Sequence, residues 1–214
     1  MILNDSYMHQ GLRKKLIDEV RKKGIADESV LMAMMKVPRH FFFDNAFLEH
    51  AYTDKAFPIA AGQTISQPYT VAYQTQLLQI KKGEKILEIG TGSGYQTCIL
   101  CELGAKVYSI ERQRELFDKA KFIFTKLNYK PQLFYGDGFK GMPAFAPFDK
   151  IIITCGAPEI PPELLKQLKV GGTMVIPHGI DVQIMTTIRK ISETEFETKE
   201  LDQFRFVPML KDKA

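Results

Sequence analysis

The first part of the chain carries apolar residues at helical spacing. Leu12, Leu16, Ile17 and Val20 share one face of a helix, and charged or polar residues stand between them. This pattern predicts an amphipathic helix over residues 8–23, with its apolar face turned toward the rest of the protein.

A second helix is expected directly after the first. Asp27 is a suitable N-cap, because its carboxylate can accept hydrogen bonds from the first free backbone N–H groups. Leu31 and Met34 follow at helical spacing, and Pro38 marks the end of the helix. Residues 39–67 show no clear period, and we expect a loop that packs on the body or covers a site. The aromatic residues of this loop are Phe41, Phe42, Phe43, Phe47, Tyr52 and Phe57.

From about Thr70 onward, short apolar segments alternate with helical ones. Strands that alternate with helices imply a parallel sheet covered by helices on both faces, which is an α/β architecture. Strands are expected at residues 85–89, 106–110, 132–135, 149–154 and 173–176, and helices at 71–78, 96–103, 113–127 and 162–168.

The end of the chain follows a different pattern. Residues 182–191 and 195–206 alternate polar and apolar positions, with a turn near Ser192. Alternation with a period of two predicts an antiparallel hairpin, which would close one edge of the sheet.

Composition limits the class of protein. The 214 residues are 45% hydrophobic and 25% charged, which suits one globular domain with a sizeable core. The net charge is only +4, and the Lys and Arg residues are spread among acidic residues without forming a cluster. We therefore expect no nucleic-acid partner. The chain starts without an apolar leader, and its longest purely aliphatic run is Ile151–Ile153. We therefore expect a cytoplasmic protein that does not enter a membrane.

Cys98 and Cys101 form a C-x-x-C pair, which could suggest redox chemistry or zinc. Their neighbours are apolar, so we interpret both as residues of a buried helix face. With Cys155 they are too few for a disulfide framework. The four histidines show no paired ligand spacing, and no metal site is expected.

The most informative local motif is the segment 88–95, which reads E-I-G-T-G-S-G-Y. A glycine-rich turn between a first strand and a helix lets a ligand approach the backbone, beyond the carboxyl ends of the strands. Gly90 and Gly92 fit the dinucleotide fingerprint G-x-G-x-x-G, but Tyr95 stands where the third glycine belongs. Glu88 would repel a pyrophosphate. It suits a cationic ligand such as S-adenosyl-L-methionine, which carries an ammonium and a sulfonium.

Two further acidic residues follow later strands. Glu111 comes at the end of the second expected strand, where a carboxylate can accept hydrogen bonds from ribose hydroxyls. Binding sites for nicotinamide cofactors and for S-adenosyl-L-methionine both contain such an acid, so Glu111 does not distinguish the two cofactors. Asp137-Gly138 follows the third strand, where the Asp can accept from the exocyclic amine of adenine. An ordinary Asp-Gly turn is the alternative there.

Several segments resemble known methyltransferases. E-x-G-x-G is similar to the first motif of Rossmann-type methyltransferases in general. The segment 62–69, G-Q-T-I-S-Q-P-Y, is more specific and resembles the signature of protein-L-isoaspartate O-methyltransferases. The resemblance extends from about residue 13 to residue 208. Its other similar segments are 37–41 (V-P-R-H-F), 148–154, 157–161, 168–172 and 205–208 (R-F-V-P).

The resemblance implies a Rossmann-like methyltransferase fold in a single domain, 1–214. Residues 1–68 would form a helical cap and substrate loop, and 69–214 the cofactor-binding core. It also implies an enzyme that transfers a methyl group from S-adenosyl-L-methionine to the free α-carboxylate of L-isoaspartyl residues in damaged proteins and peptides. We expect it to be a monomer. The methyl ester closes to a succinimide, which starts repair.

Site residues are carried over by their match to the family motifs. Ser66 is expected as the catalytic residue. The residues implied for cofactor binding are Thr64, Ile65, Glu88, Gly90, Gly92, Glu111, Asp137 and Gly138, and those for substrate binding are Thr64, Ser66, Val207 and Pro208.

Other interpretations stay open at this point. A methyltransferase with another acceptor and a nicotinamide oxidoreductase are alternative enzymes, and the glycine spacing and Glu88 disfavour the second. A non-catalytic module that binds S-adenosyl-L-methionine would share the fold. The intact T-I-S-Q-P segment argues against it. Ser66 itself could be a plain N-cap, because Ser-Gln-Pro is typical of a helix start.

Overall fold

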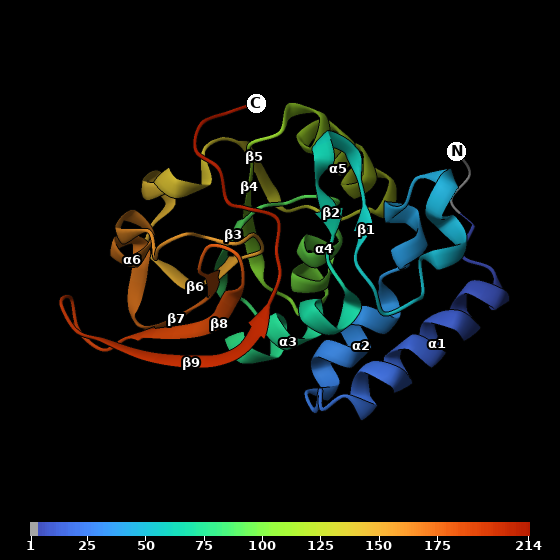
Figure 1. Ribbon diagram of the computed structural model, residues 1–214, viewed down its shortest axis with the longest axis horizontal. Helices are drawn as coiled ribbons and strands as arrows, with labels where there is room; N and C mark the ends of the chain where they lie inside the picture. Colours follow the sequence, from blue (N-terminus) through green and yellow to red (C-terminus); the bar gives the residue numbers. More distant parts are fainter. Residues whose placement is uncertain (1–3) are drawn as a thin grey trace.

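A seven-stranded sheet forms the centre of the computed structural model, which describes residues 4–214 (Figure 1). The strands are β3 (Lys85–Ile89), β4 (Lys106–Glu111), β5 (Gln132–Tyr135), β6 (Phe148–Ile153), β7 (Leu168–His178), β8 (Gln183–Lys190) and β9 (Phe196–Phe204). Their order in the sheet is β5-β4-β3-β6-β7-β8-β9. The first five strands in this order are parallel to one another, whereas β8 pairs antiparallel with both β7 and β9. The predicted mostly parallel sheet with an antiparallel edge hairpin is confirmed.

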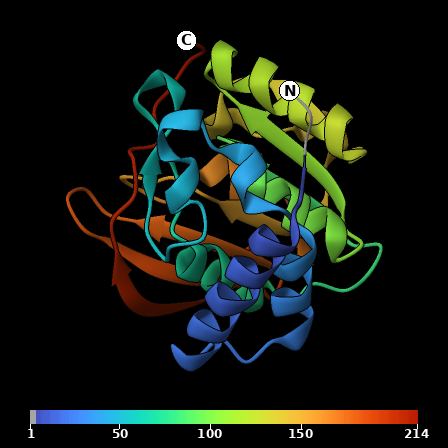
Figure 2. The ribbon, with the colours of Figure 1, turned by 90° about the vertical axis from the view of Figure 1, so that its right-hand side faces the viewer.

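Helices cover both faces of the sheet. They are α1 (Tyr7–Lys22), α2 (Glu28–Lys36), α3 (Pro68–Leu78), α4 (Tyr95–Glu102), α5 (Arg114–Leu127) and α6 (Pro162–Gln167). One face is covered by α3, α4 and α5, and α6 packs against β7 on the other. The helices α1 and α2 form an outer layer over α3 and α4 (Figure 2).

Burial explains the apolar runs in the central strands. In β3, four of the five residues are buried, because helices cover the sheet on both sides. Ile86 packs in the apolar cluster with α3 and α4, and Leu87 packs in the opposite cluster with α6. In contrast, β9 forms one of the two edges of the sheet and has no buried residue, which accounts for its polar composition.

The N-terminal helices share a core with the rest of the chain. Leu16 of α1 and Leu31 of α2 belong to the same buried cluster as Ile99 of α4. Asp27 is the N-cap of α2, as predicted, and its carboxylate accepts a hydrogen bond from the Ser29 N–H at 2.9 Å. This packing joins the predicted helical cap to the helix that follows the glycine loop.

The segment 39–67 has more structure than the predicted loop. It contains the 3-10 helices η1 (Arg39–Phe42), η2 (Asn45–His50) and η3 (Ala60–Gly62) and a short antiparallel pair, β1 (Phe57–Pro58) and β2 (Thr64–Ile65). Two more 3-10 helices follow β5, η4 (Gly138–Lys140) and η5 (Pro143–Phe145). The aromatic residues do pack on the body, since the ring of Phe42 lies edge-on to that of Tyr95.

The largest difference between a predicted and an observed strand boundary is at the start of β7. The strand β7 begins at Leu168, whereas the sequence pattern placed its start at Thr173. Leu168 pairs with Phe148 of β6, and a register shift separates this pairing from that of Lys150 with Thr173. Gly171 and Gly172, which lie between the helix expected at 162–168 and the strand expected at 173–176, are inside this irregular part of β7.

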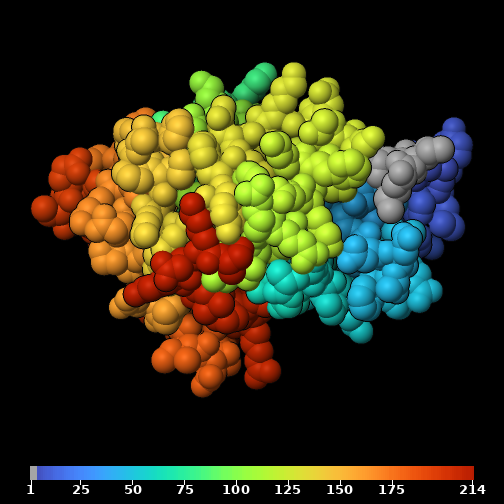
Figure 3. Space-filling view, turned by 90° about the horizontal axis from the view of Figure 1, so that it is seen from above, coloured from blue at the N-terminus to red at the C-terminus, as the bar shows by residue number. Residues whose placement is uncertain are grey.

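The C-terminal tail returns across the carboxyl ends of the strands. The Gly156 N–H donates to the Val207 carbonyl at 2.8 Å, and the Met209 N–H donates to the Gly156 carbonyl at 2.7 Å. The tail, in red, crosses one face of the molecule beside the cyan segment that contains β1 and β2 (Figure 3). This return brings Val207 and Pro208 to the site described below. Within residues 4–214, no helix is both long and apolar enough to cross a membrane.

Candidate active site

A cavity opens at the carboxyl ends of β3, β4 and β6, which is where ligands bind in open α/β sheets. It contains about 880 Å³ of empty space, including its open mouth. Its walls come from the glycine loop after β3, the end of β4, the segment containing β2, and the C-terminal tail. The predicted site residues that line it are Thr64, Ile65, Ser66, Gly90, Gly92, Glu111, Gly138, Val207 and Pro208.

The glycine loop has a backbone that favours glycine. Gly90 and Gly92 have φ angles of 92° and 56°, a region that other residues rarely adopt. A Cβ atom on Gly90 would lie 2.7 Å from the Thr154 Oγ1 atom. That hydroxyl donates to the Gly90 carbonyl at 2.6 Å, which ties the loop to the end of β6. The loop therefore brings bare backbone to the cavity wall.

Glu111 joins the end of β4 to the same loop. Its Oε2 atom accepts a hydrogen bond from the Gly92 N–H at 2.8 Å, and its Oε1 atom accepts one from the Gln113 N–H at 2.8 Å. Burial raises the pKa of Glu111, and these backbone hydrogen bonds oppose the rise. The residue is 4% exposed and lines the cavity, so its carboxylate is held in place with lone pairs left for a ligand.

Glu88 lies behind the cavity wall and does not line the cavity. It is fully buried, and its Oε2 atom accepts hydrogen bonds from the Thr97 and Ser109 hydroxyls, both at 2.6 Å. Burial raises its pKa to about 7, despite these hydrogen bonds. The Ser109 hydroxyl also contacts that of Thr91, a cavity residue. Glu88 is therefore linked to the cavity through two hydroxyls and not by direct contact.

Asp137 and Gly138 occupy different positions. The Asp137 carboxylate accepts a hydrogen bond from the Phe139 N–H at 2.9 Å, which makes it the N-cap of η4. Asp137 is absent from the cavity wall, whereas Gly138 is part of it. Gly138 also packs tightly against β3, because a Cβ atom built on it would overlap the Ile89 Cγ2 atom.

Ser66 is not the helix cap that its sequence also suggested. The N-cap position of α3 is Gln67, and the Tyr69 N–H donates to the Asp54 carboxylate at 2.8 Å. Asp54, from a distant part of the loop, takes the capping role. Within residues 4–214, the Ser66 hydroxyl has no hydrogen-bond partner, so it is available to a ligand.

A second groove adjoins the cavity at Ser66. Thr64, Ser66, Thr154 and Val207 line both spaces. The groove continues between α3 and the end of β9, past Tyr69, Phe204 and Phe206. Ser66 therefore lies between a space bounded by the glycine loop and a space bounded by the C-terminal strand.

Comparison with known proteins identifies the family. The family model for protein-L-isoaspartate(D-aspartate) O-methyltransferases matches residues 11–214. The chain belongs to this family. It is 63% identical over 212 residues to the protein-L-isoaspartate O-methyltransferase of Christiangramia forsetii, covering 99% of this chain and 100% of that one. The identity to that of Flavobacterium johnsoniae is 59% over 212 residues, with the same coverage.

Solved structures of the family share the fold. One protein-L-isoaspartate O-methyltransferase matches with a TM-score of 0.84 at 27% identity, covering 92% of this chain and 65% of that chain. A second, from Plasmodium falciparum in complex with S-adenosyl-L-homocysteine, matches with a TM-score of 0.82 at 24% identity, covering 94% and 99%. The resemblance inferred from the sequence and the Rossmann-like fold are thereby confirmed.

In this family member the C-x-x-C cysteines lie in the helix after the glycine loop. Cys98 is buried and Cys101 partly buried, and both thiols are free. Burial raises the pKa of Cys101 to about 12 and raises that of Cys98 well above its usual value. A thiol that stays protonated is a poor nucleophile and a poor metal ligand, which supports the interpretation as core residues.

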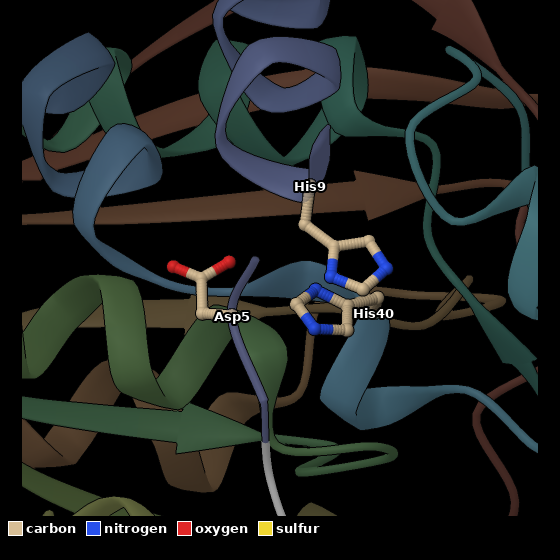
Figure 4. Close-up of side chains that lie close together, drawn as sticks. All are labelled: Asp5, His9 and His40. Atoms are coloured by element: carbon tan, nitrogen blue, oxygen red, sulfur yellow. The ribbon is translucent and has the colours of Figure 1, made fainter. Parts of the chain in front are cut away.

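Asp5, His9 and His40 come together outside the cavity (Figure 4). Their potential ligand atoms lie within 4.8 Å of one another, as in a metal site. However, both Asp5 oxygens accept hydrogen bonds from Arg13, and the His40 Nδ1 atom contacts the Tyr52 hydroxyl at 2.6 Å. The two imidazoles stack with centroids 3.9 Å apart, so lone pairs in the ring planes do not converge. We interpret the cluster as an anchor of the N-terminal segment on η1.

Several cavity residues were not predicted as site residues from the sequence. Thr154, Cys155 and Gln96 line the cavity of this methyltransferase. Thr154 lies in a segment that resembles the family, but its role depends on β6 being the neighbour of β3. That adjacency belongs to the sheet order, which no local pattern in this chain specifies.

Proposed function

We propose that this cavity and groove carry out the family's reaction as one unit, with the roles given below. The enzyme transfers the methyl group of S-adenosyl-L-methionine to the free α-carboxylate of L-isoaspartyl residues in damaged proteins and peptides. The observation that carries the proposal is the position of Ser66, which lies between the cavity at the glycine loop and the adjoining groove. Such a residue can touch a cofactor on one side and a peptide on the other.

The cavity fits a cationic nucleoside without phosphates. Glu111 offers a fixed carboxylate to the two ribose hydroxyls, and the bare backbone at Gly90 and Gly92 allows close approach. A pyrophosphate would face Glu111, with Glu88 buried behind the loop. Arg112, at the same wall, donates to the Asp212 carbonyl in the C-terminal tail. The acids therefore favour the cation that S-adenosyl-L-methionine presents.

We assign the remaining cofactor contacts by position. Gly138 would lie beside the adenine ring, with Asp137 capping η4 next to it, and Thr64 and Ile65 would close the cavity from the side of β2. Glu88 would act on the ammonium at a distance, through the Ser109 and Thr91 hydroxyls. When bound, S-adenosyl-L-methionine supplies an electrophilic methyl group.

The protein must position the acceptor, and it need not remove a proton. An α-carboxyl has a pKa of about 3.3–3.7, so the acceptor is already ionised near neutral pH. We assign Ser66 the role of donating a hydrogen bond that orients this carboxylate toward the cavity. Val207 and Pro208, with Thr64, would hold the peptide backbone on either side. Correct approach and the exclusion of water then account for the catalysis.

The methyl ester is the product that makes repair possible. Methoxide leaves an ester carbonyl far more readily than oxide leaves a carboxylate. The neighbouring backbone amide nitrogen can therefore attack the ester carbonyl, lose its proton and expel methanol, which forms a succinimide without an enzyme. The succinimide opens partly to normal aspartate. The enzyme therefore starts the repair, and the later steps follow from the chemistry of the ester.

We further propose that the enzyme acts as a monomer in the cytoplasm. One chain supplies every wall of the cavity described above, so no second copy is needed to complete the site. All three cysteines are free, which suits a reducing compartment. We propose no nucleic-acid partner, since the cavity and groove are bounded by neutral and acidic residues as well as basic ones.

Methyl transfer to matched peptides tests the proposed function. Labelled S-adenosyl-L-methionine is incubated with the enzyme and with either an L-isoaspartyl peptide or its normal aspartyl twin. The isoaspartyl linkage moves the carboxylate by one methylene, and misplacement by about 1 Å can cost on the order of 100-fold. We expect at least that preference in kcat/KM for the isoaspartyl peptide. Equal rates on the two peptides would refute the proposed acceptor, and cofactor binding without any turnover would indicate a binding module.

A further inference from the structure

Arg39 is a fully buried arginine in direct contact with the backbone of Ser66. It begins η1, and none of its surface is exposed to solvent. Its Nη2 atom donates a hydrogen bond to the Ser66 carbonyl oxygen at 2.9 Å. The segment 37–41 resembles the family, but the function proposed above gives Arg39 no role.

The charge of Arg39 is poorly compensated. Its Nε and Nη1 atoms are buried and have no hydrogen-bond partner within residues 4–214. The guanidinium lies over the rings of Tyr95, at 4.7 Å from the centroid, and Phe43, at 5.3 Å. Burial lowers the pKa of Arg39 to about 10, against the opposite effect of Tyr95 and Asp54. The side chain therefore stays charged at neutral pH.

A buried cation without a paired anion is costly to the folded protein. Asp54 raises the pKa of Arg39 through its charge, but its carboxylate is bonded to Lys23, Gln67 and the Tyr69 N–H instead. An anion that arrives beside Ser66 would offset this cost. The proposed acceptor is a carboxylate, and it loses its charge when it is methylated.

We propose that Arg39 is a positioning residue for the isoaspartyl carboxylate. It would hold the Ser66 backbone in place and supply positive potential that favours an anionic acceptor. This inference rests on the proposed function, since it requires the carboxylate to lie at Ser66. Arginine suits the role because a planar guanidinium can stack on two rings while it donates to a carbonyl, which an ammonium does less well.

The surroundings hold Arg39 in a fixed position. The next residue, His40, contacts the Tyr52 hydroxyl through Nδ1 at 2.6 Å and the Asn4 carbonyl through Nε2 at 3.3 Å. Its ring also stacks on that of His9 at the start of α1. These contacts hold His40 on the N-terminal segment, whereas the Arg39 guanidinium itself is held by the Ser66 carbonyl and the rings of Phe43 and Tyr95.

The test compares Arg39→Met, Arg39→Lys and the control Arg13→Met. Arg13 is also a buried arginine, but it bonds to Asp5 and Tyr52 and does not contact Ser66. For each variant, we would measure kcat and KM for the isoaspartyl peptide and Kd for S-adenosyl-L-homocysteine. We would also measure competitive inhibition by two non-substrate peptide analogues that carry either an α-carboxylate or an α-carboxamide at the isoaspartyl position.

We expect Arg39→Met to raise the peptide KM at least tenfold and to remove the preference for carboxylate over carboxamide, with the Kd for the cofactor product changed less than threefold. Arg39→Lys should keep that preference but lower kcat about tenfold, because it keeps the charge without the planar contacts. Arg13→Met should lower thermal stability and leave the preference intact.

Three outcomes would overturn the inference. They are an unchanged carboxylate preference in Arg39→Met, a loss of the same preference in Arg13→Met, or wild-type kcat in Arg39→Lys. If Arg39→Met does not fold, Arg39→Lys still decides, since it must show lowered kcat with the preference retained. A wild-type enzyme that fails to methylate the isoaspartyl peptide would refute the proposed function instead, which keeps the two failures apart.

Discussion

Glu111 and Gly92 are joined by a hydrogen bond of 2.8 Å, in which the glycine N–H donates to the carboxylate. The residue assigned to the ribose therefore also holds the glycine loop, so its two roles are coupled. The Gln113 N–H occupies the other carboxylate oxygen at 2.8 Å. Each oxygen still has a lone pair that can face the cavity.

Glu111→Ala should weaken the binding of S-adenosyl-L-methionine by about 1–3 kcal/mol, roughly 5–150-fold. The variant loses the charge-assisted hydrogen bonds to the ribose. It also leaves the Gly92 N–H without its carboxylate acceptor. Calorimetric titration gives the affinity, and the KM for the cofactor should rise in parallel. Glu111→Gln is the matched control, and it should lose less because its carbonyl can still accept one of these bonds. An unchanged affinity in both variants would mean that Glu111 does not contact the cofactor.

Ser66→Ala should lower kcat on the order of 10–100-fold and leave measurable activity, because the serine orients the acceptor and does not react. For the wild-type enzyme, kcat at saturating substrates should be nearly flat between about pH 6 and 8, since the acceptor needs no general base. Steady-state kinetics across this range and mass spectrometry of the enzyme are the measurements. A steep dependence on a basic group near pH 7, or a methylated Ser66, would contradict the positioning role.

Glu88→Gln should change how stability depends on pH. The folded pKa of Glu88 is about 7, above the ordinary value of 4.5, so the folded protein binds more protons than the unfolded chain between these values. This residue's contribution to stability is thus present below about pH 4.5 and is lost as pH rises toward 7. The loss is at most about 3 kcal/mol. Glutamine has no charge to desolvate, so the variant should lack this slope.

Urea unfolding of the wild-type protein and of Glu88→Gln, at several pH values between 4.5 and 8, gives the difference in their free energies of unfolding. The stability of Glu88→Gln relative to wild type should rise across this interval. Over the same interval, the affinity of Glu88→Gln for S-adenosyl-L-methionine should fall relative to that of the wild type. The reason is that only the wild type gains a buried negative charge, which favours a cation in the cavity. A constant difference in stability across the interval would show that Glu88 does not titrate there.

Gly138→Ala should damage the cavity, and Gly136→Ala should not. An added Cβ at Gly138 would overlap the Ile89 side chain, so η4 or β3 must shift at a cost of about 1–3 kcal/mol. At Gly136, the Cβ would lie 3.5 Å from the Ile110 Cγ2 atom, an ordinary contact, and the cost should stay within about 0.5 kcal/mol. Thermal melts and cofactor titration of the two variants test this. Equal effects would show that the contact with Ile89 is not limiting.

The local sequence determined most of the elements of this protein. The apolar run of β3 and the glycines after it predicted a strand, a turn and a helix, because these depend on neighbouring residues. Asp27 was predicted as a cap and is one, since capping involves only the next few N–H groups. The family motifs added the identity of the cofactor and of the acceptor, which the spacing of residues alone left open.

The tertiary structure decided which side chains meet. Ser66 looked like a helix cap, but Asp54 caps α3 through a fold of the loop that no local pattern indicates. Glu88 was expected to favour a cationic ligand, and β3 places its side chain toward α4, where it is buried behind the cavity wall. The contact of Arg39 with Ser66 spans 27 residues and could not be predicted from either segment. Local preferences depend on adjacent residues, whereas burial and partners depend on the packing of distant segments, and for this reason only the folded chain fixes the site.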